Sequence, residues 1–274
     1  MRAGPASSSF RRPTRPHDLD QAAFHLADID ALTFAYVGLA AFAASIVGGV
    51  SGYGVGLILP VVIAPVVGVA GIVPTMAVSM AITNFSRVVA FWRDIDWPRA
   101  RLALLGAVPC CVLSAYVYTL LPTAAIAAVL GVCLLGSVPL RRALAKAGWR
   151  ASDGGIVAGG ATYGILIGGM TGLGAIVIAT FMAAGMEGAA LIGSDALVSL
   201  FTNLVKVAVF GTRTALDLDL ALAGLLMGVC TIPGAFVGRW LLERFSMSIH
   251  TAMMDALVLF GGATFLWRAW TGAA

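Results

Sequence analysis

Two basic residues occupy matching positions in similar apolar segments. Arg87 lies in "TNFSRVVAF" and Lys206 in "TNLVKVAVF", and each follows an asparagine, Asn84 or Asn203, by three residues. A cation within a membrane span costs at least a few kcal/mol and is a functional candidate by default. Residues three apart share a helical face, so amide and cation together could line a path for an anion. A long side chain near the end of a span could instead extend to the interface, and this alternative stays open.

Two glycine clusters, "IVGGVSGYG" and "LIGGMTGLG", also match each other. Glycine inside a helix is about 1 kcal/mol less favourable than alanine, so each cluster predicts a helix break. The helix after a break directs free N–H groups and its positive dipole end into the gap, which suits an anion. The alternative is that the glycines only allow close helix packing. The candidate substrate-binding residues are Gly49, Ser51, Gly52, Gly54, Asn84, Arg87, Gly169, Thr171, Gly172, Gly174, Asn203 and Lys206.

Asp195, in "GSDAL", is the only acid well inside an apolar segment. It could take up a coupling proton, or it could form a structural hydrogen bond, and the sequence leaves both open. The three histidines are dispersed, and there is no catalytic triad, HExxH motif or P-loop. We therefore expect no catalytic residues, no metal site and no cofactor.

The composition is that of a membrane protein. Of 274 residues, 60% are hydrophobic and 11% are charged, whereas a soluble domain carries about 25% charged residues. The net charge of +4 comes from arginines that flank apolar segments, which indicates membrane topology rather than nucleic-acid binding. The cysteines lie in apolar segments and predict buried thiols.

Glycine, proline and charge divide the chain into apolar segments. We expect them at 31–50, 55–70, 72–92, 100–121, 123–140, 154–171, 173–186, 189–211, 219–241 and 249–268. The segments 55–70 and 173–186 are short and directly follow the glycine clusters. If both dip into the membrane and return, nearly all loop Lys and Arg lie on the N-terminal side, leaving Arg239 and Arg244 opposite. This favours an all-α polytopic protein with about eight transmembrane helices, two short re-entrant or broken helices, and both termini cytoplasmic.

The matching motifs lie about 120 residues apart and in the same order, which predicts an internal duplication. Transporters are commonly built from such repeats, with the site at the repeat interface. We expect a disordered cytoplasmic tail at 1–28, membrane repeats at 29–141 and 154–270, and a basic cytoplasmic linker at 142–153.

The segments "GGVSGYGVGLILPVV" and "AVSMAITNFSRVVAFWRDIDWPRA", with their second-half echoes, resemble the TauE/SafE family of sulfite and organosulfonate exporters. Pro60 has no proline counterpart in the second half. The resemblance implies a secondary transporter in the inner cell membrane that exports a small sulfur-containing anion, with H+ or Na+ as a possible coupling ion. The alternatives are uptake of sulfate or another oxyanion or carboxylate, an integral-membrane enzyme, and a non-transporting scaffold. The sequence does not indicate an oligomeric state.

Overall fold

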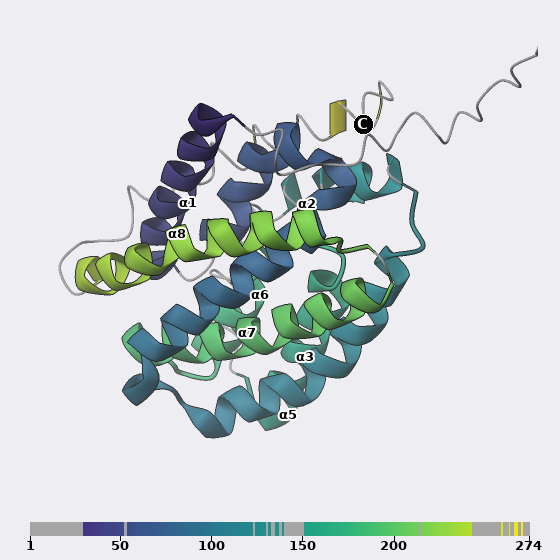
Figure 1. The fold of residues 1–274 in the computed structure, drawn as a ribbon. Coiled ribbons are helices and arrows are strands. Elements are labelled where there is room, and N and C mark those ends of the chain that lie inside the picture. Colours follow the sequence, from purple (N-terminus) through teal and green to yellow (C-terminus); the bar gives the residue numbers. More distant parts are fainter. Residues whose placement is uncertain are drawn as a thin grey trace, which may run out of the picture.

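The computed structural model describes residues 30–51, 54–122, 124–129, 131–132, 135–136, 139, 151–213 and 215–242, together with positions 259, 263, 266, 267 and 270. Every element in this part of the chain is a helix (Figure 1). The elements are α1 (Ala31–Ser51), α2 (Gly54–Ala90), the short 3₁₀ helix η3 (Trp92–Asp94), α3 (Trp97–Tyr118), α5 (Asp153–Ile167), α6 (Ala175–Ala183), α7 (Gly188–Thr212) and α8 (Leu218–Leu242).

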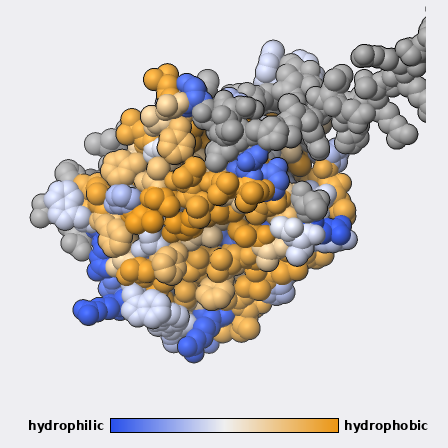
Figure 2. All heavy atoms as spheres, viewed as in Figure 1, coloured by the Kyte–Doolittle hydropathy of each residue, from blue (hydrophilic) through white to orange (hydrophobic). Residues whose placement is uncertain are grey.

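Five of these helices are long and apolar enough to cross a membrane, namely α1, α2, α3, α7 and α8. Figure 2 shows that apolar side chains cover most of the visible surface. The expectation of an all-α membrane protein is confirmed. The tail at 1–28, most of the linker, most of the expected span at 249–268 and part of the expected span at 123–140 lie outside the described residues.

Helix α2 consists of two helical parts that meet at Gly68, whose φ of 69° and ψ of 166° are not helical. A positive φ is accessible to glycine without steric cost, so the chain can turn sharply here. Pro74 lies just beyond the turn and has no N–H to donate to the carbonyl of Ala70. The hydroxyl of Tyr118 donates to that carbonyl instead, at 3.2 Å. The sequence divided this region at residues 70–72, close to the observed turn.

The chain reverses direction at this turn. The first part of α2 runs back along α1, since Gly48 lies against Val55 and Phe34 lies beside Ile63 in a shared pocket. The second part runs in the same direction as α8. Near its beginning, the carbonyl of Thr75 lies close to Gly224, and at its end the ring of Phe91 lies beneath the guanidinium of Arg239.

Helix α6 reverses the chain in the same way in the second half. The backbone N–H of Ala151, just before α5, donates to the carbonyl of Ala183 at the end of α6. Thr180 of α6 in turn faces Gly159 of α5, so these two helices are antiparallel. With nine residues, α6 is about 14 Å long, against about 30 Å for the hydrocarbon core of a bilayer.

These reversals correct the expected topology. The eight-span interpretation placed the loop at 93–101 and Arg239 on opposite sides of the membrane. In the structure Arg239 Nη2 lies 3.3 Å from Asp94 Oδ2, so both are on the same side. The eight-span interpretation is wrong because it makes the segments 55–70 and 173–186 enter the membrane and leave it on the same side. In the structure the first part of α2 runs back along α1, and α6 runs back along α5. The next helix therefore begins near the side on which α1 or α5 began. Consequently the second part of α2 and α7 run antiparallel, where the eight-span interpretation makes them parallel.

Candidate functional site

The two glycine-rich regions meet through their backbones. A Cβ on Gly56 would lie 2.6 Å from the backbone nitrogen of Gly172, and one on Gly172 would lie 2.7 Å from the carbonyl oxygen of Gly56. Gly172 also has a φ of +81°, which a residue with a Cβ rarely adopts. We call this contact the glycine junction. The sequence predicted Gly172 as a site residue but did not single out Gly56.

A small pocket lies beside the glycine junction and is shared by α2, α5, α7 and the break before α6. Its lining residues are Met80, Tyr163, Ile167, Gly172, Gly174, Ser199 and Asn203. Of these, Gly172, Gly174 and Asn203 were predicted from the sequence. The others, Met80 on α2, Tyr163 and Ile167 on α5, and Ser199 on α7, were missed because they do not belong to a recognisable motif.

The polar groups of this pocket are partly paired. The hydroxyls of Tyr163 and Ser199 lie 3.2 Å apart, and Asn203 Nδ2 donates to the carbonyl of Ser199 at 2.7 Å. Asn203 Oδ1 is buried without a hydrogen-bond partner, and so is the hydroxyl of Thr171, which precedes the lining residue Gly172 but is not itself part of the lining. Buried polar atoms are usually satisfied, so unpaired groups at a pocket indicate a place where a polar ligand can bind.

Lys206 is completely buried on α7, one turn beyond Asn203. Its ammonium Nζ donates to the carbonyl of Met170 at 3.2 Å, and Met170 lies in the glycine-rich break next to Thr171. No acidic side chain forms an ion pair with it among the residues that the structure describes. An isolated buried charge is unfavourable, so this cation creates a strong preference for an anion nearby.

Arg87, the predicted counterpart of Lys206, has a different environment. It is 3% exposed, and its Nη2 lies 3.1 Å from Asp195 Oδ2 in a buried ion pair that joins α2 to α7. Its Nη1 donates to Asn84 Oδ1 at 2.9 Å, as their three-residue spacing predicted. Neither Arg87 nor Lys206 extends to the surface, so both side chains differ from interfacial anchors.

Other predicted site residues make packing contacts. A Cβ on Gly49 would lie 2.8 Å from Gly238 Cα on α8, and one on Gly54 would lie 2.9 Å from the backbone nitrogen of Gly48. Gly169 lies against the ring of Tyr118. The packing explanation therefore accounts for these glycines. Gly52 and the side chain of Ser51 lie outside the described part of the chain.

The backbone on the two sides of the glycine junction is not equivalent. Pro60 cannot donate to the carbonyl of Gly56, four residues earlier, so this carbonyl lacks its ordinary helical partner. On the other side, Gly174 caps the beginning of α6, and the first N–H groups of a helix have no partner within it. The first half thus contributes an acceptor, and the second half contributes donors.

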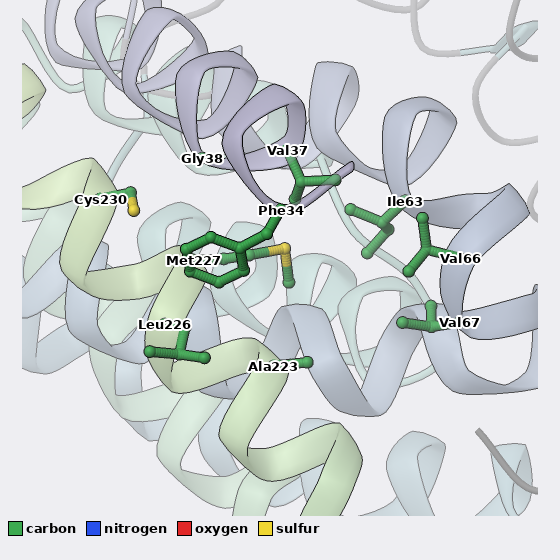
Figure 3. Close-up of a pocket in the computed structure, with 10 residues that line it drawn as sticks. All are labelled: Phe34, Val37, Gly38, Ile63, Val66, Val67, Ala223, Leu226, Met227 and Cys230. Carbon is green, nitrogen blue, oxygen red and sulfur yellow. The ribbon is translucent and has the colours of Figure 1, made fainter. Parts of the chain in front are cut away.

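A second pocket lies away from the glycine junction, between α1, the first part of α2, and α8 (Figure 3). It is lined by apolar and sulfur-containing side chains, including Phe34, Ile63, Met227 and Cys230. No charged or strongly hydrogen-bonding side chain is part of this lining. The polar pocket at the junction is therefore the candidate anion site.

The long apolar helices define an integral membrane protein. The sequence matches the family described as Sulfite exporter TauE/SafE over residues 37–265, which is most of the chain. The chain belongs to this family. Comparisons with curated proteins and with solved structures gave no match.

Proposed function

We propose that this protein is a secondary transporter that exports a small sulfur-containing anion, such as sulfite or a short organosulfonate. The observation that carries the proposal is the environment of Lys206. Its ammonium is fully buried, has no acidic partner among the described residues, and binds the backbone of the break that forms the glycine junction. The family match supports a transported anion of the sulfite type.

In this proposal the anion occupies the pocket beside the glycine junction. Lys206 supplies the positive charge, since its ammonium donates to the carbonyl of Met170 in the glycine-rich break. Thr171 is 4% exposed, and its hydroxyl, which is buried without a hydrogen-bond partner, supplies a donor. Gly172 and Gly174 let the backbone approach, because no side chain stands between it and the pocket. The N–H groups at the beginning of α6 add a favourable dipole.

We further propose that the two halves are inverted repeats. Helices α1, α3 and the first part of α2 have counterparts in α5, α8 and α6 that begin about 120 residues later. The packing supports the correspondence, because α1 packs on α8 while α5 packs on α3. Glycines mediate both contacts, with Gly49 against Gly238 and Gly160 against Ala103. An inverted repeat would let one half move against the other around a central site.

The test is counterflow of labelled sulfite in proteoliposomes, with affinity measured on equal amounts of folded protein. Lys206→Gln should weaken sulfite binding about ten- to a hundredfold, since a charge-assisted hydrogen bond contributes about 1.5–3 kcal/mol. Lys206→Arg should retain part of the affinity because it keeps the charge. Arg213→Gln, which changes an exposed cation at the end of α7, is the matched control.

Wild-type affinity in Lys206→Gln would refute the proposed site, and absence of counterflow in the wild type would refute the proposed substrate. The same vesicles identify the driving ion, since an imposed H+ gradient or an imposed Na+ gradient can be tested separately. Outward or inward accumulation under that gradient distinguishes export from uptake.

A further inference from the structure

The ion pair between Arg87 and Asp195 is buried, and its hydrogen bonding is incomplete. The two side chains are 3% and 0% exposed, and Arg87 Nη2 lies 3.1 Å from Asp195 Oδ2. In the part of the chain that the structure describes, Asp195 Oδ1, Arg87 Nε and Asn84 Nδ2 are buried without a hydrogen-bond partner. A buried ion pair offsets its desolvation only when its remaining donors and acceptors are satisfied. The pair therefore contributes little to stability, which favours a functional role.

The ion pair joins the two halves of the chain next to the anion pocket. Arg87 lies on the second part of α2 and Asp195 lies on α7. Ser199, one turn beyond Asp195 on α7, lines the pocket, and its hydroxyl lies 3.2 Å from that of Tyr163. A movement of α7 at the ion pair therefore changes the pocket as well.

We propose that Asp195 binds a proton that is transported together with the anion, an inference that rests on the proposed function. The proton forms an O–H bond with Oδ1 and turns the carboxylate into a neutral carboxyl group, and the ion pair with Arg87 is lost. The guanidinium then keeps Asn84 Oδ1 and the carbonyl of Ile192 as acceptors. Protonation makes this part of the interior more positive by one unit charge, which favours an anion in the pocket.

Protonation also changes the contact between α2 and α7. A buried cation without a compensating charge is strongly unfavourable, so Arg87 and its helix move relative to α7 when Asp195 becomes neutral. Release of the proton restores the ion pair. In this way the proton links anion binding to a movement of one half of the protein against the other.

A proton suits this place better than a metal cation. The guanidinium 3.1 Å from the carboxylate repels a cation, and hard metal cations need several oxygen ligands. Asp195 Oδ1 offers a single unpaired oxygen. A proton needs only this one atom, and the resulting carboxyl group can donate a hydrogen bond.

Other ionisable side chains lie on the elements around Asp195. In the described part of the chain they include Tyr163 of α5, Asp94 of η3, Asp96, Arg99 and Cys111 of α3, Arg239 of α8 and Lys206 of α7. The two acids among them have partners, since Asp96 lies 2.6 Å from Arg99 and Asp94 lies 3.3 Å from Arg239. Both acids are partly exposed, at 23% and 32%, so water solvates them in either protonation state. Asp195 is the acid whose protonation breaks a contact in the interior.

Labelled methanesulfonate is the probe for the test, because a sulfonate keeps its charge near neutral pH whereas sulfite takes up a proton there. Wild-type proteoliposomes receive a pH gradient while potassium and valinomycin hold the membrane potential at zero. Methanesulfonate should accumulate on the alkaline side. A sodium gradient without a pH gradient should give no accumulation.

Asp195→Asn separates coupling from transport. It should lose the accumulation and retain counterflow of methanesulfonate against sulfite, because exchange of one anion for another needs no change in protonation. Asp195→Glu should retain part of the accumulation, because it keeps a titratable carboxylate. Asp153→Asn, which changes an exposed acid at the beginning of α5, is the matched control and should behave as the wild type does.

The double variant Arg87→Gln/Asp195→Asn applies the same test where Asp195→Asn does not fold. It removes both charges, so neither is left buried without its partner. It should also show counterflow without accumulation under the pH gradient.

Three outcomes would overturn the inference while the proposed function stands. These are wild-type accumulation that ignores the pH gradient, accumulation as in the wild type in either neutral variant, and equal loss of counterflow and accumulation in folded Asp195→Asn, as a purely structural ion pair predicts. If the wild type exchanges only sulfite, sulfite replaces methanesulfonate and protein-free vesicles supply the background. If the wild type exchanges neither anion, the proposed function itself is refuted.

Discussion

Replacing Gly172 with alanine tests whether the glycine junction is a close backbone contact. The φ of +81° at Gly172 is strained for alanine, and a left-handed conformation costs an L-residue about 1–2 kcal/mol. The new Cβ would also lie 2.7 Å from the carbonyl oxygen of Gly56 and 2.9 Å from its carbonyl carbon. Backbone shifts of this kind cost about 1–3 kcal/mol, so the total loss of stability is about 2–5 kcal/mol.

Gly185→Ala is the matched control. Gly185 has nearly the same φ, +79°, but a Cβ there meets nothing within 4 Å. It should lose only the conformational contribution of about 1–2 kcal/mol. The difference between the two variants therefore measures the contact with Gly56.

The assay is denaturation of both purified variants in the same detergent, followed by sulfite counterflow on the folded fractions. Gly172→Ala should be less stable than Gly185→Ala by about 1–3 kcal/mol and should also transport more slowly. If the two variants lose equal stability and transport equally, the glycine junction is not the close contact described.

Two further predictions concern helix packing and topology. Gly106→Val should sharply reduce the yield of folded protein in size-exclusion chromatography, because a Cβ there would lie 2.6 Å from the backbone nitrogen of Ala161 on α5. Gly154→Val should have little effect, because a Cβ there meets nothing within 4 Å. Equal yields of the two variants would refute the packing of α3 on α5. In a background without native cysteines, Asp94→Cys and Ser152→Cys should react with an impermeant thiol reagent from one side of the membrane, and Arg213→Cys from the other. Labelling of Asp94→Cys and Arg213→Cys from the same side would restore the eight-span interpretation.

Helix breaks and buried cations were the features most accessible from the sequence. The glycine cluster at 168–174 predicted the break before α6, and the apolar context of Arg87 and Lys206 predicted their importance. Both features are local, since a run of glycines weakens the helix where it occurs and a charge in an apolar segment is visible within a few residues. The structure places both cations in the interior.

Contacts between the two halves of the chain were much harder to predict from the sequence. The ion pair between Arg87 and Asp195 spans 108 positions, and no local pattern marks it, so the sequence treated Arg87 and Lys206 as equivalent. The predicted eight-span topology was wrong for a related reason. To assign basic loop residues to a side of the membrane, one must know on which side the segment at 55–70 ends. The backbone conformation of Gly68, where the chain turns sharply, determines this.

Because of Pro60, the two sides of the glycine junction carry partial charges of opposite sign. Its missing N–H leaves the Gly56 carbonyl as a partial negative charge on the first-half side, where it repels an approaching anion. The beginning of α6 presents partial positive charge on the second-half side. In the second half, Thr180 stands 120 positions after Pro60, and its backbone N–H can complete the helix. At the proposed anion site, the backbone dipoles alone therefore favour an anion on the α6 side, before Lys206 contributes any charge.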